Sequence, residues 1–133
     1  MRDFVAGATV TASNVRSNDS RFAAENIIDG KKETYWATDD SVITASLVLT
    51  LRQNSTFNCL MLQEHIALGQ RVESFAVEQW DGRAWIPLVS GTTIGYKRLL
   101  RFPNVTTDKV RLIIHQAKAC PTISTFGLFK APA

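Results

Sequence analysis

The chain has 133 residues, of which 45% are hydrophobic and 20% are charged. That length suits one domain with one hydrophobic core, and the composition excludes both a disordered chain and a bundle of membrane spans. Fifteen Lys and Arg against twelve Asp and Glu leave a net charge of +3, and the basic residues are scattered. We therefore expect a single globular domain over residues 1–133 that binds no nucleic acid.

Apolar runs of strand length, separated by short turns, recur along the whole sequence. They predict strands at residues 8–12, 46–51, 57–63, 73–80, 84–88, 97–102, 109–115 and 123–129. One helical turn around residues 22–27 is the only helix that the pattern indicates. Eight strands at this spacing predict an all-β fold, a β-sandwich of two antiparallel sheets.

Two of these runs alternate with a period of two, as expected for strands with one buried face. The apolar side chains that point to the core are predicted to be Leu47, Leu49 and Leu51 in one run and Val110, Leu112 and Ile114 in the other. The dipeptide Asp81-Gly82 separates two runs and predicts a tight hairpin turn, because glycine tolerates a positive φ.

Acidic residues are concentrated between positions 25 and 40. Asp29, Glu33, Asp39 and Asp40 could in principle supply the paired carboxylates of a glycosidase, but such pairs occupy separate walls of a cleft. One acidic loop does not provide two walls, and the sequence has no GxSxG or HExxH motif. We therefore do not predict that this domain is catalytic.

The dipeptide Asp29-Gly30, followed by Thr34, fits two kinds of loop. Calcium takes six to eight oxygen ligands and favours a tight loop with an Asp and a nearby hydroxyl group. The alternative is an Asx turn, in which Asp29 accepts hydrogen bonds from backbone amides. The spacing leaves both interpretations open.

The two cysteines, Cys59 and Cys120, lie 61 positions apart and form no Cys-x-x-Cys motif. The spacing gives no reason to expect a zinc site or a disulfide. We expect two free, half-buried thiols.

Several segments together resemble a known family. They are NIIDGKKETYWAT (26–38), FNCLMLQE (57–64), GQRVESFAVEQWDGRAW (69–85), KVRLIIHQA (109–117) and ISTFGLF (123–129). In this order they resemble the factor V/VIII type C (discoidin) family. Within that family, LQEHIALGQRVESFAVE (62–78) followed by GTTIGYKRLLRF (91–102) resembles the C-terminal β-sandwich of glycoside hydrolase family 29 α-L-fucosidases. The chain is also similar to carbohydrate-binding module family 32.

The resemblance implies a galactose-binding-like jelly roll whose loops at one end hold sugars, often with a structural calcium ion. Carried over to this sequence, Asp29 and Thr34 would supply side-chain oxygens to the metal and Lys32 a backbone carbonyl. Tyr35 and Trp36 would cover the core. Thr125 stands where many relatives have a Glu ligand.

The loops that would share the sugar-binding end contain residues that can exchange hydrogen bonds with hydroxyl groups. The predicted carbohydrate-binding residues are Asp39, Asp40, Glu64, His65, Gln70 and Tyr96. For Glu64 the alternative is a surface ion pair with Arg71.

The resulting hypothesis is a non-catalytic accessory domain that binds galactose- or fucose-type glycans for the catalytic domain of a secreted or periplasmic α-L-fucosidase. One alternative is a structural domain that docks on that catalytic domain and binds no sugar. Another is a discoidin-like adhesion module, which would need exposed apolar residues at the loop tips. We expect few such residues, and no membrane binding.

Overall fold

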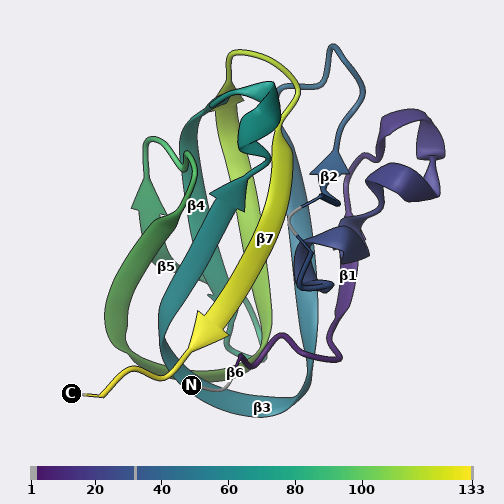
Figure 1. Ribbon diagram of the computed structural model, residues 1–133. Helices are drawn as coiled ribbons and strands as arrows, with labels where there is room; N and C mark the ends of the chain where they lie inside the picture. Colours follow the sequence, from purple (N-terminus) through teal and green to yellow (C-terminus); the bar gives the residue numbers. More distant parts are fainter. Residues whose placement is uncertain (1–2, 32, 133) are drawn as a thin grey trace.

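The computed structural model describes residues 3–31 and 33–132 of the protein (Figure 1). Its strands are β1 (Thr9–Ala12), β2 (Trp36–Ala37), β3 (Ala45–Glu64), β4 (Val72–Trp80), β5 (Trp85–Gly91), β6 (Arg98–Ala117) and β7 (Thr122–Phe129). Its short 3-10 helices are η1 (Arg16–Asn18), η2 (Ser20–Phe22), η3 (Ala24–Ile28) and η4 (Ile66–Leu68). Among the described residues, no helix has the length and apolar character needed to cross a membrane.

The strands pair in the order β2-β7-β3-β6-β4-β5, with β1 beside β3, and every pair is antiparallel. The first half of β3 pairs with β1 and with the second half of β6, whereas its second half pairs with β7 and with the first half of β6. Both long strands therefore pass from one layer to the other, as in sandwiches whose strands bend between sheets. The predicted all-β jelly-roll β-sandwich is confirmed.

Within the described residues the sheet has seven strands rather than about eight. The predicted strands 46–51 and 57–63 form one continuous strand, and 97–102 and 109–115 form another. In β3 the register shifts between Thr50 and Ser55, and the residues between them include the exposed polar run 52–54. Such a run resembles a loop in the sequence, but here it is the bend where β3 changes layer (Figure 1).

The core lies between the two layers, and the alternation predicted from the sequence is confirmed there. Leu47, Leu49 and Leu51 of β3, and Val110, Leu112 and Ile114 of β6, are all buried. Phe57, Phe75 and Phe126 fill the centre from both layers and are also buried.

The Asp81-Gly82 turn is confirmed. Its carboxylate Oδ1 accepts hydrogen bonds from the amides of Arg83 (2.7 Å) and Ala84 (2.8 Å), and Gly82 has a φ of 100°. The hydrogen bonds from Ala84 and then Arg83 lower the pKa of Asp81. This hairpin joins β4 to β5 at the end of the sandwich where β3 and β6 bend.

Both cysteines are free, as expected, but they are buried rather than half-buried. Cys59 lies in β3 and Cys120 in the connection before β7. The Cys120 thiol contacts arginine side chains at the loop end of the sandwich, as described below.

Candidate functional site

Loops from distant parts of the chain meet at the end of the sandwich opposite the bends of β3 and β6. The amide of His65 donates to the carbonyl of Thr122, and the amide of Lys118 donates to the carbonyl of Arg71, both at 2.9 Å. These bonds hold the η4 loop against the connection between β6 and β7. The convergence of loops that the resemblance implied is therefore present.

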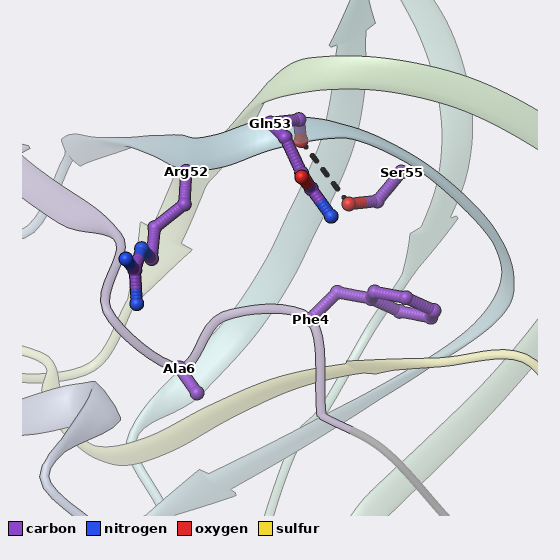
Figure 2. Close-up of a pocket in the computed structure, with 5 residues that line it drawn as sticks. All are labelled: Phe4, Ala6, Arg52, Gln53 and Ser55. Atoms are coloured by element: carbon purple, nitrogen blue, oxygen red, sulfur yellow. Dashed lines mark hydrogen bonds between the residues drawn. The ribbon is translucent and has the colours of Figure 1, made fainter.

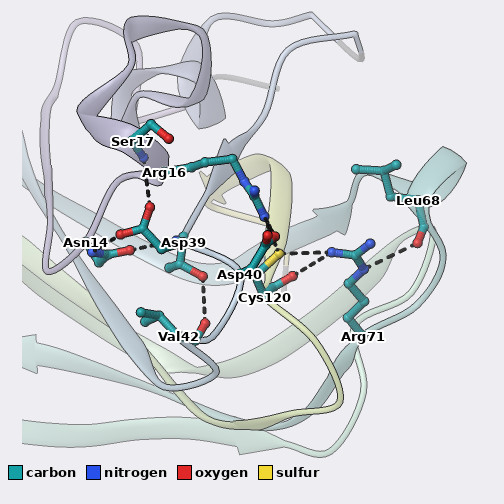
Figure 3. Close-up of polar contacts among 10 residues, drawn as sticks. Asn14, Arg16, Ser17, Asp39, Asp40, Val42, Leu68, Arg71 and Cys120 are labelled. Carbon is teal, nitrogen blue, oxygen red and sulfur yellow. Dashed lines mark hydrogen bonds and ion pairs between the residues drawn. The ribbon is translucent and has the colours of Figure 1, made fainter.

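A cavity of about 290 Å³ opens between these loops, and we call it the arginine pocket. Its lining combines charged, aromatic and apolar side chains: Arg16, Phe22, Tyr35, Ala37, Asp40, Leu68, Arg71 and Thr122. The Arg16 guanidinium forms an ion pair with Asp40, and its Nη2 donates to the Cys120 sulfur at 2.9 Å (Figure 3). The hydrogen bond to the Asp40 carboxylate is the main cause that raises the pKa of Arg16.

Arg71 approaches the same sulfur from the other side (Figure 3). Its Nη1 lies 3.1 Å from the Cys120 sulfur and 3.0 Å from the Cys120 carbonyl oxygen, and its Nε donates to the Leu68 carbonyl at 3.3 Å. The guanidinium is thus fixed by neutral acceptors. Arg71 takes part in none of the ion pairs found among the described residues.

Asp39 ties two loops together. Its carboxylate accepts hydrogen bonds from the amide of Ser17 (2.8 Å) and the side-chain nitrogen of Asn14 (3.2 Å), and its own amide donates to the Asn14 oxygen at 2.8 Å. The Ser17 amide, followed by Asn14, lowers the pKa of Asp39. Both carboxylate oxygens already have protein donors, so this residue positions the loop that carries Asp40.

Three rings are packed side by side at the rim of the arginine pocket. Tyr35 stacks on His65 with ring centroids 4.3 Å apart and an interplanar angle of 20°, and it packs against Phe22 at 5.7 Å. The Arg16 guanidinium lies 5.9 Å from the Phe22 ring. His65 and Phe22 hold the Tyr35 ring on two sides, and Tyr35 is half-buried, so part of its surface remains exposed.

A smaller cavity of about 190 Å³ lies at the same end of the sandwich, and we call it the histidine hollow. It is lined by Gln63, Glu64, His65, Ile66, Ala67, Tyr96 and Ser124. Gln70 lies beside this hollow. Its side-chain oxygen would be 3.2 Å from a Cβ added to Gly95, the residue before Tyr96. Ile66 and Leu68 are 47% and 43% exposed, so the loop tips carry more exposed apolar surface than the sequence indicated.

Glu64 is buried, with only 2% of its surface exposed. Its Oε1 accepts from the amides of Arg71 (2.8 Å) and Val72 (3.0 Å), and its Oε2 accepts from the amide of Gly95 (2.8 Å). The predicted alternative, a surface ion pair between Glu64 and the Arg71 side chain, was therefore wrong, because Glu64 accepts a hydrogen bond from the backbone amide of Arg71. This carboxylate joins the end of β3, the start of β4 and the loop before β6.

The six predicted sugar-binding residues thus divide between two neighbouring cavities. Glu64, His65 and Tyr96 line the histidine hollow, with Gln70 beside it, whereas Asp40 lines the arginine pocket and Asp39 supports it. Their contact with sugar stays a prediction. Arg16, Phe22 and Arg71 were not predicted as site residues, since a single Arg or Phe in a loop carries no signal in one sequence.

The Asp29 loop is closed by its own hydrogen bonds. The Asp29 carboxylate accepts from the amide of Lys31 (2.9 Å) and from the hydroxyl of Thr34, and Gly30 has a φ of 75°. That is the geometry of an Asx turn. Lys32 lies outside the described residues, and Thr125 lies in β7 opposite Gln63.

The side-chain oxygens of Asp29 and Thr34 are not enough by themselves to bind calcium, which takes six to eight oxygen ligands. Of the predicted ligands that the structure describes, the side chains are the Asp29 carboxylate and the Thr34 hydroxyl group, and these already bond to each other. Over residues 3–31 and 33–132, no group of three or more His, Cys, Asp or Glu residues could hold a metal ion. Calcium binding by Asp29, Lys32 and Thr34 stays a prediction.

The two interpretations of the Asp29 loop differ in their response to a chelator. We expect Asp29→Ala to lower the free energy of unfolding by about 1 kcal/mol, because the Lys31 amide and the Thr34 hydroxyl lose their acceptor. The same loss should be seen in thermal melts with calcium and with chelator. A wild-type melting temperature that falls on chelation to the level of the variant would instead show that Asp29 holds a metal ion.

A third cavity, of about 310 Å³, lies at the opposite end, where β3 bends (Figure 2). It is lined by Phe4, Ala6, Arg52, Gln53 and Ser55. The Ser55 hydroxyl donates to the Gln53 carbonyl at 3.1 Å, and the Arg52 side chain lies against Gly7, where a Cβ would be 2.5 Å from its Cδ. The cavity is far from every predicted site residue and has no carboxylate in its lining.

Comparison with known proteins defines the class of domain. Residues 9–125 match the F5/8 type C domain family, and the chain belongs to that family. A module of Clostridium perfringens, CpGH89CBM32-5, solved with GalNAc-β-1,3-galactose, shares the fold, with a TM-score of 0.82 and 16% identity over 96% of this chain and 99% of that one. The domain is therefore a non-catalytic β-sandwich of the discoidin type.

The relatives described next, which are more than 30% identical to the chain over the aligned residues, are α-L-fucosidases. A protein of Oryza sativa subsp. japonica, provisionally named alpha-L-fucosidase 1, is 42% identical over 130 residues, which are 96% of this chain and 25% of the relative. A GH29 fucosidase of Ruminococcus gnavus, solved in complex with fucose, is 31% identical with a TM-score of 0.89 over 98% of this chain and 27% of that one. The chain spans about a quarter of the length of these relatives.

Proposed function

We propose that the domain is a non-catalytic carbohydrate-binding accessory domain of a glycoside hydrolase, an α-L-fucosidase, and that the arginine pocket is its glycan site. The observation that carries the proposal is the combination, in one cavity at the loop end, of the Tyr35 ring with the Arg16 and Arg71 guanidinium groups and the Asp40 carboxylate. An apolar platform with a few convergent polar groups is the usual form of a small-molecule site. The relation to fucosidases and the fold shared with a glycan-bound module support the same conclusion.

The chemistry of these groups suits a sugar of the galactose or fucose type. The ring of Tyr35 can pack against the apolar face of a pyranose. Guanidinium groups donate hydrogen bonds to sugar oxygens, and a carboxylate accepts them from hydroxyl groups. We expect weak binding; a millimolar Kd corresponds to about 4 kcal/mol.

The proposal predicts that Tyr35→Ala abolishes measurable binding to a panel of galactose- and fucose-terminated glycans. Loss of the aromatic ring that would pack on the sugar should cost about 1–2 kcal/mol, which moves a millimolar Kd beyond detection. Binding is measured by NMR titration, and thermal melts confirm that the variant is folded at the titration temperature. Tyr96→Ala is the matched control, since Tyr96 lines the histidine hollow and is 56% exposed.

Comparison of the two tyrosine variants shows which of the two cavities binds the glycan. If Tyr96→Ala removes binding and Tyr35→Ala does not, the glycan site is the histidine hollow. If the wild-type domain binds no glycan on a broad panel, the proposal is wrong.

A second candidate function is docking on the catalytic domain of the parent enzyme. The observation that favours it is an apolar groove on the outer face of the layer that contains β7, lined by Cys59, Met61, Lys97, Leu99, Arg101, Phe129 and Ala131. Leu99 is 59% exposed there. A domain that makes up about a quarter of a longer protein has the remainder of that chain available as a partner, and this function takes first place if no glycan binds.

A further inference from the structure

The charges of the arginine pocket are not balanced. Its lining contains two guanidinium groups, Arg16 and Arg71, and one carboxylate, Asp40, which leaves one positive charge in excess. Asp40 neutralises Arg16 directly. In the part of the chain that the structure describes, no carboxylate forms an ion pair with Arg71.

Arg71 is also held in a fixed position. Its Nε and Nη1 donate to two backbone carbonyls and a thiol, and its backbone amide donates to the buried Glu64 carboxylate. These bonds leave Nη2 without an acceptor among the described residues. Two N–H groups of a half-buried guanidinium therefore remain available to a ligand.

A ligand that covers this guanidinium must compensate its charge. Removing a charge from water is costly unless a hydrogen-bonded counter-charge replaces the water. A neutral hydroxyl group supplies a hydrogen bond but no charge, whereas a carboxylate or a sulfate supplies both. Charge-assisted bonds of this kind are roughly twice as strong as neutral ones.

From these observations we propose that the arginine pocket takes an acidic saccharide, whose carboxylate or sulfate group binds Arg71 while its ring lies on Tyr35. This inference rests on the proposed function, because it assigns the glycan class of the same cavity. The cavity volume of about 290 Å³ is near the lower end of small-molecule sites, which suits one sugar residue rather than an extended chain.

The test compares ligands that share the galactopyranose ring and differ in the group at C6, which is neutral or anionic. The wild-type domain is titrated by NMR with galactose, galacturonic acid and galactose 6-sulfate, each as its methyl glycoside. We expect at least one acidic ligand to bind at least about fivefold more tightly than galactose, and its advantage to fall when salt is raised, because partly exposed charges are screened. The acidic ligand with the lower Kd identifies which anionic group the pocket prefers.

Three variants test whether the preference for acidic ligands depends on Arg71. Arg71→Gln should remove the advantage of the acidic ligand, whereas Arg83→Gln, which removes the same charge at the other end of β4, should leave it unchanged. Nine residues of strand separate the two arginines, a length of roughly 30 Å, which is several Debye lengths at physiological salt. Asp40→Asn should tighten acidic ligands by about threefold without tightening galactose, since it removes a repulsive charge from the rim.

Asp40 has a side chain that is 88% exposed, so Asp40→Asn tests the proposal even if Arg71→Gln is unstable. Galactose that binds as tightly as both acidic ligands and is lost in Tyr35→Ala would overturn the acidic preference and leave the proposed function intact. Equal losses in Arg71→Gln and Arg83→Gln would also overturn it, because the attraction would then be nonspecific. Absence of binding by every ligand would instead count against the proposed function itself.

Discussion

Glu64→Ala is expected to lower the free energy of unfolding by about 3–5 kcal/mol, because three backbone amides, two of them in buried hydrogen bonds, lose their acceptor at once. The amides of Arg71, Val72 and Gly95 all donate to this carboxylate, and the side chain is almost completely buried. For a domain of this size, that loss corresponds to a fall in Tm of roughly 10–20 °C. Denaturant unfolding and thermal melts followed by circular dichroism measure it.

Two variants sharpen this test. Glu64→Gln keeps one acceptor oxygen but turns an amide donor toward another donor, so we expect a smaller loss of about 1–3 kcal/mol. Glu73→Ala removes the same charge from an exposed position on β4 and should change stability by less than about 0.5 kcal/mol. Equal effects of Glu64→Ala and Glu73→Ala would show that the three amides are satisfied by water and that Glu64 is not a structural link.

The role of Glu64 affects how binding can be studied. Because its carboxylate fixes the backbone of Arg71 and of Gly95, which precedes Tyr96, its removal would disturb both cavities at the loop end. A loss of sugar binding in Glu64→Ala would therefore not show that Glu64 touches sugar. Substitutions at exposed positions, such as Asp40, avoid this ambiguity.

The sequence contained part of this information. The alternation that buries Leu60 and Leu62 continues to Glu64, so the inward direction of Glu64 could have been expected from the period of two. What the alternation cannot reveal is the partner of the carboxylate, because its three amides come from two segments, one beginning seven residues and the other 31 residues along the chain. Those contacts are set by tertiary structure alone.

The fold was predictable because its apolar alternation is a local signal, and the errors in the predicted strands have a physical cause. Period-two runs such as Leu47, Leu49 and Leu51 depend on one layer only, so local sequence identifies them. The bend of β3 depends on pairing with β6 on both sides of residues 51–54, and the polar residues there resemble a loop. Whether such a segment ends a strand or bends it between layers is decided by the partner strand.

The arginine pocket shows the same division between local and distant signals. Loop convergence follows from the topology, and the Asp29-Gly30 turn from local chemistry, so both could be expected from sequence. The pocket itself is formed by Arg16, Tyr35, Asp40 and Arg71, which come from three separate loops. Nothing in any one loop marks its arginine as part of a site.

The core and the site are joined at Trp36, which has no exposed surface. It lies in β2, directly after Tyr35, and its Nε1 donates to the carbonyl of Asn14 at 2.9 Å. Asn14 in turn bonds to Asp39 through its side chain. One buried ring therefore anchors both the segment that carries Tyr35 and Asp40 and the loop that leads to Arg16.

We expect Trp36→Ala to lower the free energy of unfolding by about 3–5 kcal/mol, because a large buried ring is replaced by a cavity. Trp36→Phe keeps most of the apolar contact and loses the bond to Asn14, so it should cost about 1–2 kcal/mol. Trp85→Ala is the control, since Trp85 is half-buried on the outer face, where it packs on Trp80 and Arg111. Its cost should be clearly smaller, at about 1 kcal/mol.

The Phe variant also tests whether the buried ring sets the geometry of the pocket. If it does, Trp36→Phe should weaken glycan binding at a temperature where the protein remains folded, because the Asn14 carbonyl has lost its donor and the loop that carries Arg16 is less firmly held. Trp85→Ala should leave binding unchanged, since Trp85 lies on the outer face of β5. Unchanged binding in Trp36→Phe, together with the expected loss of stability, would mean that the hydrogen bonds of Asp39 alone are sufficient to position the loops.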